Sequence, residues 1–118
     1  MIMELSKKKC TSCEGGVPKL KPGQARELNS QLISSWEIID DLKIQKTFVF
    51  SNFIETMNFV NKVAEIAEQE GHHPVMHIYY AKAEIELWTH AIMGLSENDF
   101  ILAAKIELLY QGFGKKQR

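Results

Sequence analysis

The stretch GHHPVMHIYYAKAEIELWTH, residues 71–90, contains the signals that decide the fold. Gly71 fits the left-handed residue that ends a helix, and Pro74 pushes the residue before it into extended backbone. Residues 75–80 and 83–90 then alternate as two strands of an antiparallel hairpin. In the second strand one face carries Ala83, Ile85, Leu87 and Thr89, and the other carries Glu84, Glu86, Trp88 and His90.

The residues on either side predict the remaining elements. Helices are expected over 22–34, 52–70 and 96–110, and a first hairpin over 36–39 and 43–50 with its turn at Asp40-Asp41. The buried stripe of the middle helix is expected to contain Phe53, Met57, Val60, Ala64 and Ala67, and to be widened by Phe59, Val63 and Ile66. The order α-β-β-α-β-β-α predicts an α+β two-layer sandwich, in which a four-stranded antiparallel sheet has three helices packed on one face.

A chain of 118 residues has room for one compact domain. The predicted elements place that domain at residues 22–111. Residues 1–21 are expected to form an irregular N-terminal extension, because Gly15, Gly16 and Pro18 follow one another closely. Residues 112–118 are expected to form a loose C-terminal tail.

Composition excludes several classes of function. The 14 Lys and Arg residues and 15 Asp and Glu residues give a net charge of −1, whereas proteins that hold nucleic acid through phosphates are usually basic. The longest stretch without these residue types, 71–81, is too short to span a bilayer. The N-terminus lacks the apolar segment of a secretory signal, so we expect a cytoplasmic protein that binds neither nucleic acid nor membrane.

All four histidines fall between residues 72 and 90, and three of them mark a candidate site. His72 and His73 occupy a bend between a helix and a strand, and His90 is expected to end a strand. Catalytic groups often lie at such positions. Imidazole titrates near neutral pH and can therefore give or take a proton. Solvated turn residues would produce the same pattern, so the residues alone leave both interpretations open.

Three other side chains are expected near these histidines. Glu68 falls in the last turn of the middle helix, although a solvated acidic helix end would look the same. Asp99 stands three residues after Ser96, where it can cap a helix and could also orient the ring of His90. Trp88 shares the outer sheet face with His90, so we count it among the substrate-binding candidates.

Cys10 and Cys13 are the only cysteines, and with the histidines they raise the question of a metal site. A structural zinc site needs four converging ligands, and no second cysteine pair completes one. His73 and His77 are four residues apart, but Pro74 between them argues against the helix that would align them. We therefore expect free thiols and no metal site.

The combined pattern resembles the pterin-4a-carbinolamine dehydratase family. The residues that carry the resemblance are Glu68, His72-His73-Pro74, Tyr80, Thr89-His90, Gly94-Leu95-Ser96 and Asp99. These blocks match in order and spacing, and the similarity runs from about Trp36 to the last helix. The segment from Cys10 to Pro18 is similar to the N-terminal extension of many bacterial and plant members.

The resemblance implies a fold, a reaction and roles for the site residues. The implied fold is the α+β sandwich. The implied reaction is dehydration of 4a-hydroxytetrahydropterin to quinonoid dihydropterin, which recycles the cofactor of aromatic amino-acid hydroxylases and needs no metal or organic cofactor. The catalytic candidates are His72, His73, His90 and Asp99, with His72 and His90 as the acid–base pair, and the substrate-binding candidates are Glu68, His73 and Trp88. Which histidine is the acid stays open.

The same resemblance implies an alternative function and an assembly. Some animal members act as dimerisation cofactors of a transcription factor, so the alternative is a non-catalytic interaction protein. That role does not need the histidines, whereas the dehydratase does. Relatives pair edge strands across a two-fold axis, so we expect a homodimer or homotetramer.

Overall fold

The computed structural model describes residues 4–11 and 17–116, with side chains to Phe113. Within them three helices and four strands follow the predicted order. The helices are α1 (Pro22–Ser30), α2 (Phe53–Glu70) and α3 (Glu97–Lys116). The strands are β1 (Glu37–Ile39), β2 (Lys43–Val49), β3 (Val75–Ile78) and β4 (Lys82–Leu87). Two short 3-10 helices, η1 (Leu5–Lys7) and η3 (His90–Ile92), complete the described elements.

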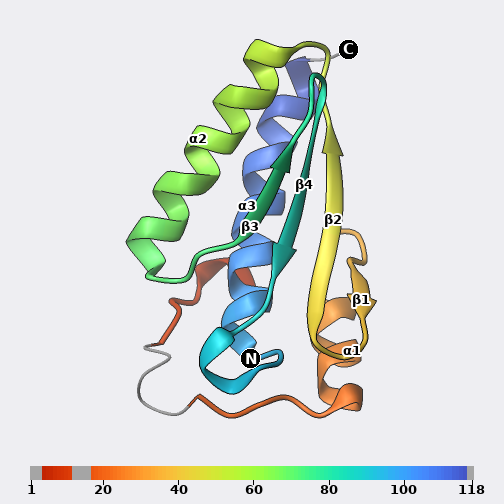
Figure 1. Cartoon of the computed structure of the whole chain (residues 1–118), viewed down its shortest axis with the longest axis vertical. Coiled ribbons are helices and arrows are strands. Elements are labelled where there is room, and N and C mark those ends of the chain that lie inside the picture. The colour runs from red at the N-terminus through yellow and green to blue at the C-terminus, as the bar shows by residue number, and fades with distance from the viewer. Residues whose placement is uncertain (1–3, 12–16, 117–118) are drawn as a thin grey trace.

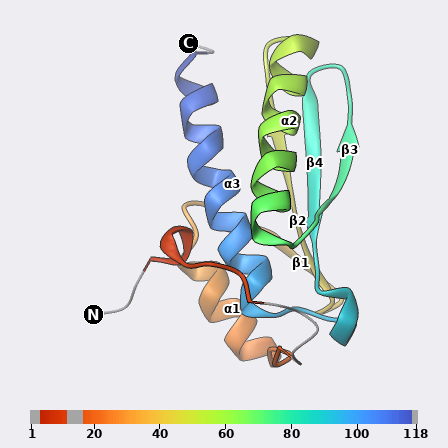
Figure 2. The same ribbon diagram turned by 90° about the vertical axis from the view of Figure 1, so that its left-hand side faces the viewer.

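The sheet is antiparallel throughout, with the strand order β1-β2-β4-β3. The helices lie on one face of it (Figure 1 and Figure 2), which confirms the predicted α+β two-layer sandwich. We call the opposite face, which carries Glu84 and Glu86, the open face. No helix in residues 4–11 and 17–116 is long and apolar enough to cross a membrane.

The alternation in β4 separates the core from the open face as predicted. Ala83, Ile85 and Leu87 have no exposed surface. Their register partners include Ile44 and Phe48 of β2, which extend the same apolar layer. Burying an aliphatic or aromatic side chain of this size contributes about 1.5–3 kcal/mol. The core layer therefore fixes which side chains of β4 must point outward.

Two predicted turns have the backbone that their residues favour. Asp40 and Asp41 both adopt a φ of 53° in the turn between β1 and β2. Gly71 has a φ of 66° at the end of α2, where a residue without a Cβ is favoured. At the other end of α2, the side chain of Asn52 accepts a hydrogen bond from the backbone nitrogen of Glu55 at 2.9 Å. Both predicted ends of this helix are confirmed.

The buried stripe of α2 agrees in part with the prediction. Phe59, Val60, Val63 and Ala67 are buried as predicted, whereas Thr56 is buried and Phe53 and Ala64 are exposed against the prediction. Phe59 belongs to the core because its ring packs on Phe48 and Phe50, with centroid distances of 5.1 and 5.0 Å. This aromatic contact, which joins the helix to β2, sets the rotation of α2 about its axis.

The helix α1 ends at Ser30, four residues earlier than predicted. The buried carboxylate of Glu107 in α3 accepts hydrogen bonds from the backbone nitrogens of Ile33 at 2.9 Å and Ser34 at 3.1 Å. It also accepts one from the indole nitrogen of Trp36 at 3.2 Å. Because α3 satisfies these donors, the chain leaves the helix and turns toward β1.

The N-terminal segment contains more regular structure than the predicted irregular extension. Leu5 of η1 is buried against the core. The ammonium group of Lys105 in α3 donates to the carbonyl oxygen of Ser6 at 2.8 Å, and Lys8 pairs with Glu97 at 2.6 Å. Residues 4–11 therefore pack along α3 (Figure 2).

The C-terminal helix is longer than predicted. Instead of ending near Tyr110, α3 continues to Lys116, so residues 112–116 are helical and not a loose tail. The rings of Tyr110 and Phe113 contact Phe50 with centroid distances of 5.5 and 6.0 Å. These aromatic contacts stabilise the additional turns against the core.

Candidate active site

His72 follows the end of α2 and turns its ring toward the interior. The residue is 5% exposed, and its Nε2 lies 2.6 Å from Oδ1 of Asp99, which has no exposed surface. Because an ionised carboxylate can only accept hydrogen bonds, this contact places a proton on Nε2 of His72. The carboxylate therefore fixes both the orientation and the tautomer of the imidazole.

Asp99 is held by the first turn of α3 and by the segment after β4. Its Oδ2 accepts hydrogen bonds from the backbone nitrogen of Ser96 and from Oγ1 of Thr89, both at 2.9 Å. The hydroxyl oxygens of Thr89 and Ser96 lie 2.8 Å apart. The predicted capping contact between Asp99 and Ser96 is thus present. The histidine that Asp99 contacts is His72, whereas the sequence suggested His90.

Sequence reasoning missed the part that Thr89 plays in this network. Thr89 is fully buried, on the inward side of the sheet where Leu87 also lies. A buried hydroxyl requires a hydrogen-bond partner. That requirement was the available signal that Thr89 has a partner, and the structure identifies the partner as Asp99, ten residues later.

His73 and Glu68 form a second pair at the surface. The Nε2 atom of His73 lies 2.6 Å from Oε1 of Glu68, and the side chains are 61% and 79% exposed. The last turn of α2 and the bend at Pro74 bring them together. Glu68 does not line the cleft described below, so its contact with the site runs through His73.

His90 and Trp88 come from the segment that follows β4. Because β4 ends at Leu87, His90 begins η3 and does not end a strand as predicted. Thr89 and Gly94 form an isolated bridge that closes this loop. The rings of Trp88 and His90 are in contact, with a centroid distance of 4.5 Å and an interplanar angle of 44°.

These side chains surround a cleft of about 450 Å³. The cleft is lined by Gly71, His72, His73, Pro74, Val75, Trp88, His90 and Ala91. It thus brings together four of the predicted site residues from two segments of the chain, while Asp99 stands behind His72 and outside the lining. Three imidazoles and one indole around one small space suit proton transfer to a flat, partly apolar molecule.

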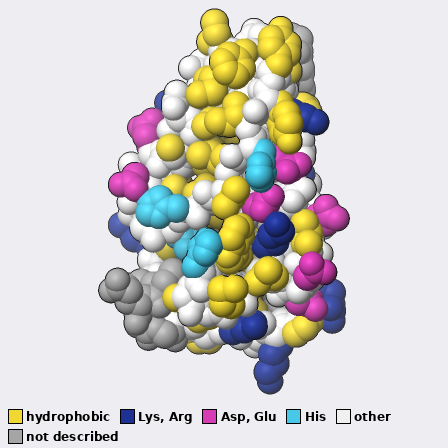
Figure 3. All heavy atoms as spheres, in the orientation of Figure 1, with side chains coloured by type: hydrophobic (Ala, Val, Ile, Leu, Met, Phe, Trp, Pro, Cys, Tyr) yellow, Lys and Arg dark blue, Asp and Glu magenta, His cyan; other side chains and the backbone are white. Residues whose placement is uncertain are grey.

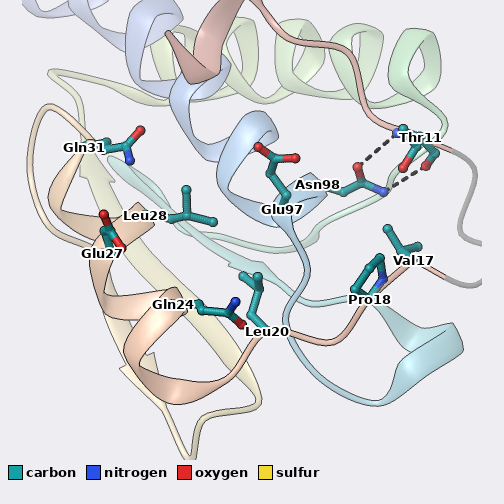
Figure 4. Close-up of a pocket in the computed structure, with 10 residues that line it drawn as sticks. All are labelled: Thr11, Val17, Pro18, Leu20, Gln24, Glu27, Leu28, Gln31, Glu97 and Asn98. Carbon is teal, nitrogen blue, oxygen red and sulfur yellow. Dashed lines mark hydrogen bonds between the residues drawn. The ribbon is translucent and has the colours of Figure 1, made fainter. Parts of the chain in front are cut away.

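A second hollow of about 470 Å³ lies between the N-terminal segment, α1 and the start of α3 (Figure 4). Leu20 and Leu28 line it together with amide side chains such as Gln24 and Gln31. Asn98 at its edge holds the backbone of Thr11 through two hydrogen bonds of 3.0 and 2.8 Å. The hollow contains no histidine and none of the predicted site residues, so we do not assign the chemistry to it.

Within the described residues one group has the composition of a metal site: His77, Glu84 and Glu86, whose ligand atoms lie within 4.8 Å of one another. Histidine and acidic side chains gather on this face of the molecule (Figure 3). However, the ammonium group of Lys43 lies 2.9 Å from Glu86, and His77 lies 2.9 Å from its other oxygen. The hydrogen bond from Lys43 is the main reason why the pKa of Glu86 is lowered. Because Lys43 already neutralises this carboxylate, we interpret the group as an ion-pair network.

Cys10 is half-buried next to α3 and α2. Its Sγ lies 3.6 Å from the carbonyl oxygen of Asn98, and its backbone nitrogen donates to Glu70 at 2.8 Å. Burial, and then the charge of Glu70, raise the pKa of the thiol to about 12. A thiol with this pKa stays protonated at neutral pH and is a poor nucleophile or metal ligand. The other predicted free thiol, Cys13, lies outside the described residues.

Comparison with known proteins identifies the class to which this fold and site belong. Residues 18–109 match the family described as pterin 4 alpha carbinolamine dehydratase. A protein of Nitrosomonas eutropha named "Putative pterin-4-alpha-carbinolamine dehydratase" is 49% identical over 92% of this chain and 95% of its own length. A Rickettsia canadensis protein of the same name is 48% identical over 87% of this chain and 94% of its own. The chain belongs to the pterin-4-alpha-carbinolamine dehydratase family.

Two solved structures have a similar fold. A protein from Brucella melitensis described as a transcriptional coactivator/pterin dehydratase has a TM-score of 0.74 and 26% identity, over 79% of this chain and 99% of its own. A pterin dehydratase-like protein described as a RuBisCO assembly factor in the alpha-carboxysome has a TM-score of 0.57 and 25% identity, over 66% and 92%. The family fold therefore accompanies more than one described role.

Proposed function

We propose that this chain dehydrates 4a-hydroxytetrahydropterin to quinonoid dihydropterin and water by histidine general acid–base catalysis. The observation that carries the proposal is the buried His72–Asp99 pair at 2.6 Å, whose histidine lines one cleft together with His73, Trp88 and His90. Family membership supports the pterin as the substrate class.

The reaction requires two proton transfers at neutral pH. The C4a–O bond breaks, and the departing oxygen takes a proton from an imidazolium to leave as water. A ring nitrogen of the pterin loses its proton to a neutral imidazole, and its electron pair forms the new C=N bond. His72 and His90 both line the cleft and are the proposed pair. No metal or organic cofactor enters this balance.

The remaining site residues are proposed to bind the pterin. Trp88 offers an aromatic face of the cleft wall against which a flat ring system can pack. His73 lines the cleft, and Glu68, which lies 2.6 Å from His73 and outside the lining, is proposed to polarise the amino-pyrimidine edge through that histidine. In the cell this activity would return the spent cofactor of aromatic amino-acid hydroxylases to use, and we propose the cytoplasm as its location.

The direct test is a dehydratase assay with chemically generated 4a-hydroxytetrahydropterin, following the rate of quinonoid product formation above the spontaneous rate. The matched control is the H72Q/H90Q double variant, prepared and measured in parallel. Acceleration by the wild type that is abolished in the double variant would support the proposal. A wild-type protein that is folded and gives only the spontaneous rate would overturn it.

The alternative is a non-catalytic interaction role. The exposed apolar side chains Val49, Phe53, Ile54, Ile78, Tyr79 and Tyr80 favour a protein contact at the end of the molecule opposite the cleft. The cleft adjoins the last residue of α2, whereas Phe53 begins this 18-residue helix, about 27 Å away. An interaction role would tolerate the loss of both histidines, so the same double variant distinguishes the two functions.

A further inference from the structure

A row of side chains crosses the open face of the sheet and ends in the cleft. Its members, in order of contact, are His77, Glu86, Lys43, Trp88 and His90. They come from β3, β4, β2, the segment after β4 and η3. The proposed dehydratase mechanism uses only the last two.

Lys43 is the centre of this row. Its ammonium group lies 2.9 Å from Oε1 of Glu86, and the two side chains are 27% and 11% exposed. Glu86 is held from its other side by His77, whose Nε2 lies 2.9 Å from Oε2. Because both oxygens of Glu86 are engaged, the carboxylate fixes the position of the lysine.

The same ammonium group lies over the ring of Trp88, 5.7 Å from its centroid. The strand register explains this placement. Ile44 of β2 pairs with Leu87 of β4 in antiparallel orientation, so Lys43 and Trp88, each one position beyond this pair in the same direction, lie side by side. A cation at this distance from an indole face is attracted to it, and more strongly when both groups are partly removed from water. Trp88 is half-buried and its ring also contacts His90, so the cation restricts the movement of the indole that forms this contact.

We propose that Lys43 is a positioning residue of the cleft: anchored by Glu86, it holds the indole of Trp88 against His90 and so sets the cleft wall and the place of the His90 imidazole. Its effect on turnover rests on the proposed function. Its effect on the Trp88–His90 contact does not, and can be measured without substrate.

The activity test compares K43M, which keeps the length of the side chain and removes its charge, with K43R, which keeps the cation. K82M is the matched control, because Lys82 lies over the ring of Tyr79 at 4.8 Å but outside the cleft. We expect K43M to lower kcat/KM about threefold to tenfold, the size of one cation–aromatic contact, and K43R to restore most of it. K82M should stay within twofold of the wild type. Melting curves of each variant show that the fold is retained.

The substrate-free test uses tryptophan fluorescence. A protonated imidazole in contact with an indole quenches its emission, so emission should fall as the pH is lowered and imidazole gains a proton. The pH-dependent fall in emission of the wild type minus that of H90Q is the quenching amplitude of the Trp88–His90 contact. We expect K43M to reduce this quenching amplitude by at least half, and K43R and K82M to preserve it.

The outcomes separate the two proposals. Loss of the quenching amplitude with loss of kcat/KM in K43M, and recovery of both in K43R, supports the positioning role. An unchanged amplitude in a folded K43M protein overturns it, as does unchanged kcat/KM or an equal loss in K82M. If the wild type has no dehydratase activity, the proposed function fails, and the fluorescence amplitudes still decide whether Lys43 positions Trp88.

Discussion

The Nε2 atom of His72 lies 2.6 Å from Oδ1 of Asp99, and both side chains are withdrawn from solvent although they come from different ends of different helices. Asp99 receives three hydrogen bonds, because Thr89 and the backbone of Ser96 also donate to it. One buried carboxylate therefore joins the end of α2, the segment after β4 and the start of α3. Loss of this carboxylate should therefore lower both the free energy of unfolding and the rate of catalysis.

The D99N substitution should keep the shape of the Asp99 side chain and remove its negative charge. An amide can donate toward His72 and would favour the wrong tautomer, so we expect kcat to fall about 10²- to 10⁴-fold. Replacing a charged acceptor of several hydrogen bonds should also lower the free energy of unfolding by about 1–3 kcal/mol. Steady-state kinetics and denaturant unfolding measure the two effects. The control is E97Q in the same helical turn, which should leave kcat unchanged and lower the free energy of unfolding by no more than about 1 kcal/mol, since it breaks only the partly exposed pair with Lys8. Normal turnover of folded D99N would remove Asp99 from the mechanism.

The H90Q substitution should keep the fold, because His90 is exposed at the rim of the cleft. If His90 transfers a proton, kcat should fall about 10²- to 10⁴-fold, and H72Q should behave similarly. The double variant should lose much less than the product of the two single losses, because groups that act as a unit are not additive. Kinetics with melting curves for all three variants decide this, and near-normal turnover in folded H90Q would contradict the role assigned to His90.

The H73Q substitution should weaken pterin binding more than turnover, so KM should rise while kcat stays within about tenfold. His73 and Glu68 are both exposed and contribute at most about 1 kcal/mol to stability. If they act as one binding unit, E68Q should raise KM similarly and H73Q/E68Q should add little. Initial rates over a range of substrate concentrations test this. A fall in kcat as large as that of H90Q would make His73 a proton-transfer residue instead.

Replacing both cysteines with serine should leave dehydratase activity within about twofold, and a chelator should change neither activity nor melting temperature. Stoichiometric zinc in the purified protein, with activity lost on its removal, would refute the interpretation of the cysteines as free thiols that bind no metal.

The stability of the fold at alkaline pH should depend on Cys10. Since the pKa of the Cys10 thiol is raised from 9.0 to about 12, its contribution to the free energy of unfolding is fully present below pH 9 and is lost as the pH rises toward 12. Wild type should therefore lose more stability than C10A over this alkaline range.

The chain should form a homodimer or homotetramer through the edge strand β3. This strand lies at one edge of the sheet and ends at the exposed Ile78, which is followed by the exposed Tyr79. Among residues 4–11 and 17–116, β3 pairs with β4 alone, and an edge strand next to exposed apolar side chains favours pairing with a second copy. Light scattering at tens of micromolar should give at least twice the monomer mass, I78K should reduce it, and I33K at a distant exposed site should not. A monomeric wild type would disprove this assembly.

The sequence by itself determined the elements and their order. The alternation of Ala83, Ile85 and Leu87 with Glu84 and Glu86 identifies β4, and Gly71 before a proline-containing bend ends α2. These signals are local, because helix ends, turns and strand alternation depend on neighbouring residues. The spacing of the histidines also gave the candidate site, together with the family resemblance.

The tertiary structure alone decided which side chains are partners. Asp99 contacts His72, 27 residues away, and Glu107 ends α1 by accepting hydrogen bonds from backbone more than 70 residues earlier. Phe113 extends α3 because it reaches the ring of Phe50. Lys43 meets Trp88 only through the register of β2 on β4. Each of these contacts depends on how whole elements pack against one another, and that packing has no counterpart in local sequence periodicity.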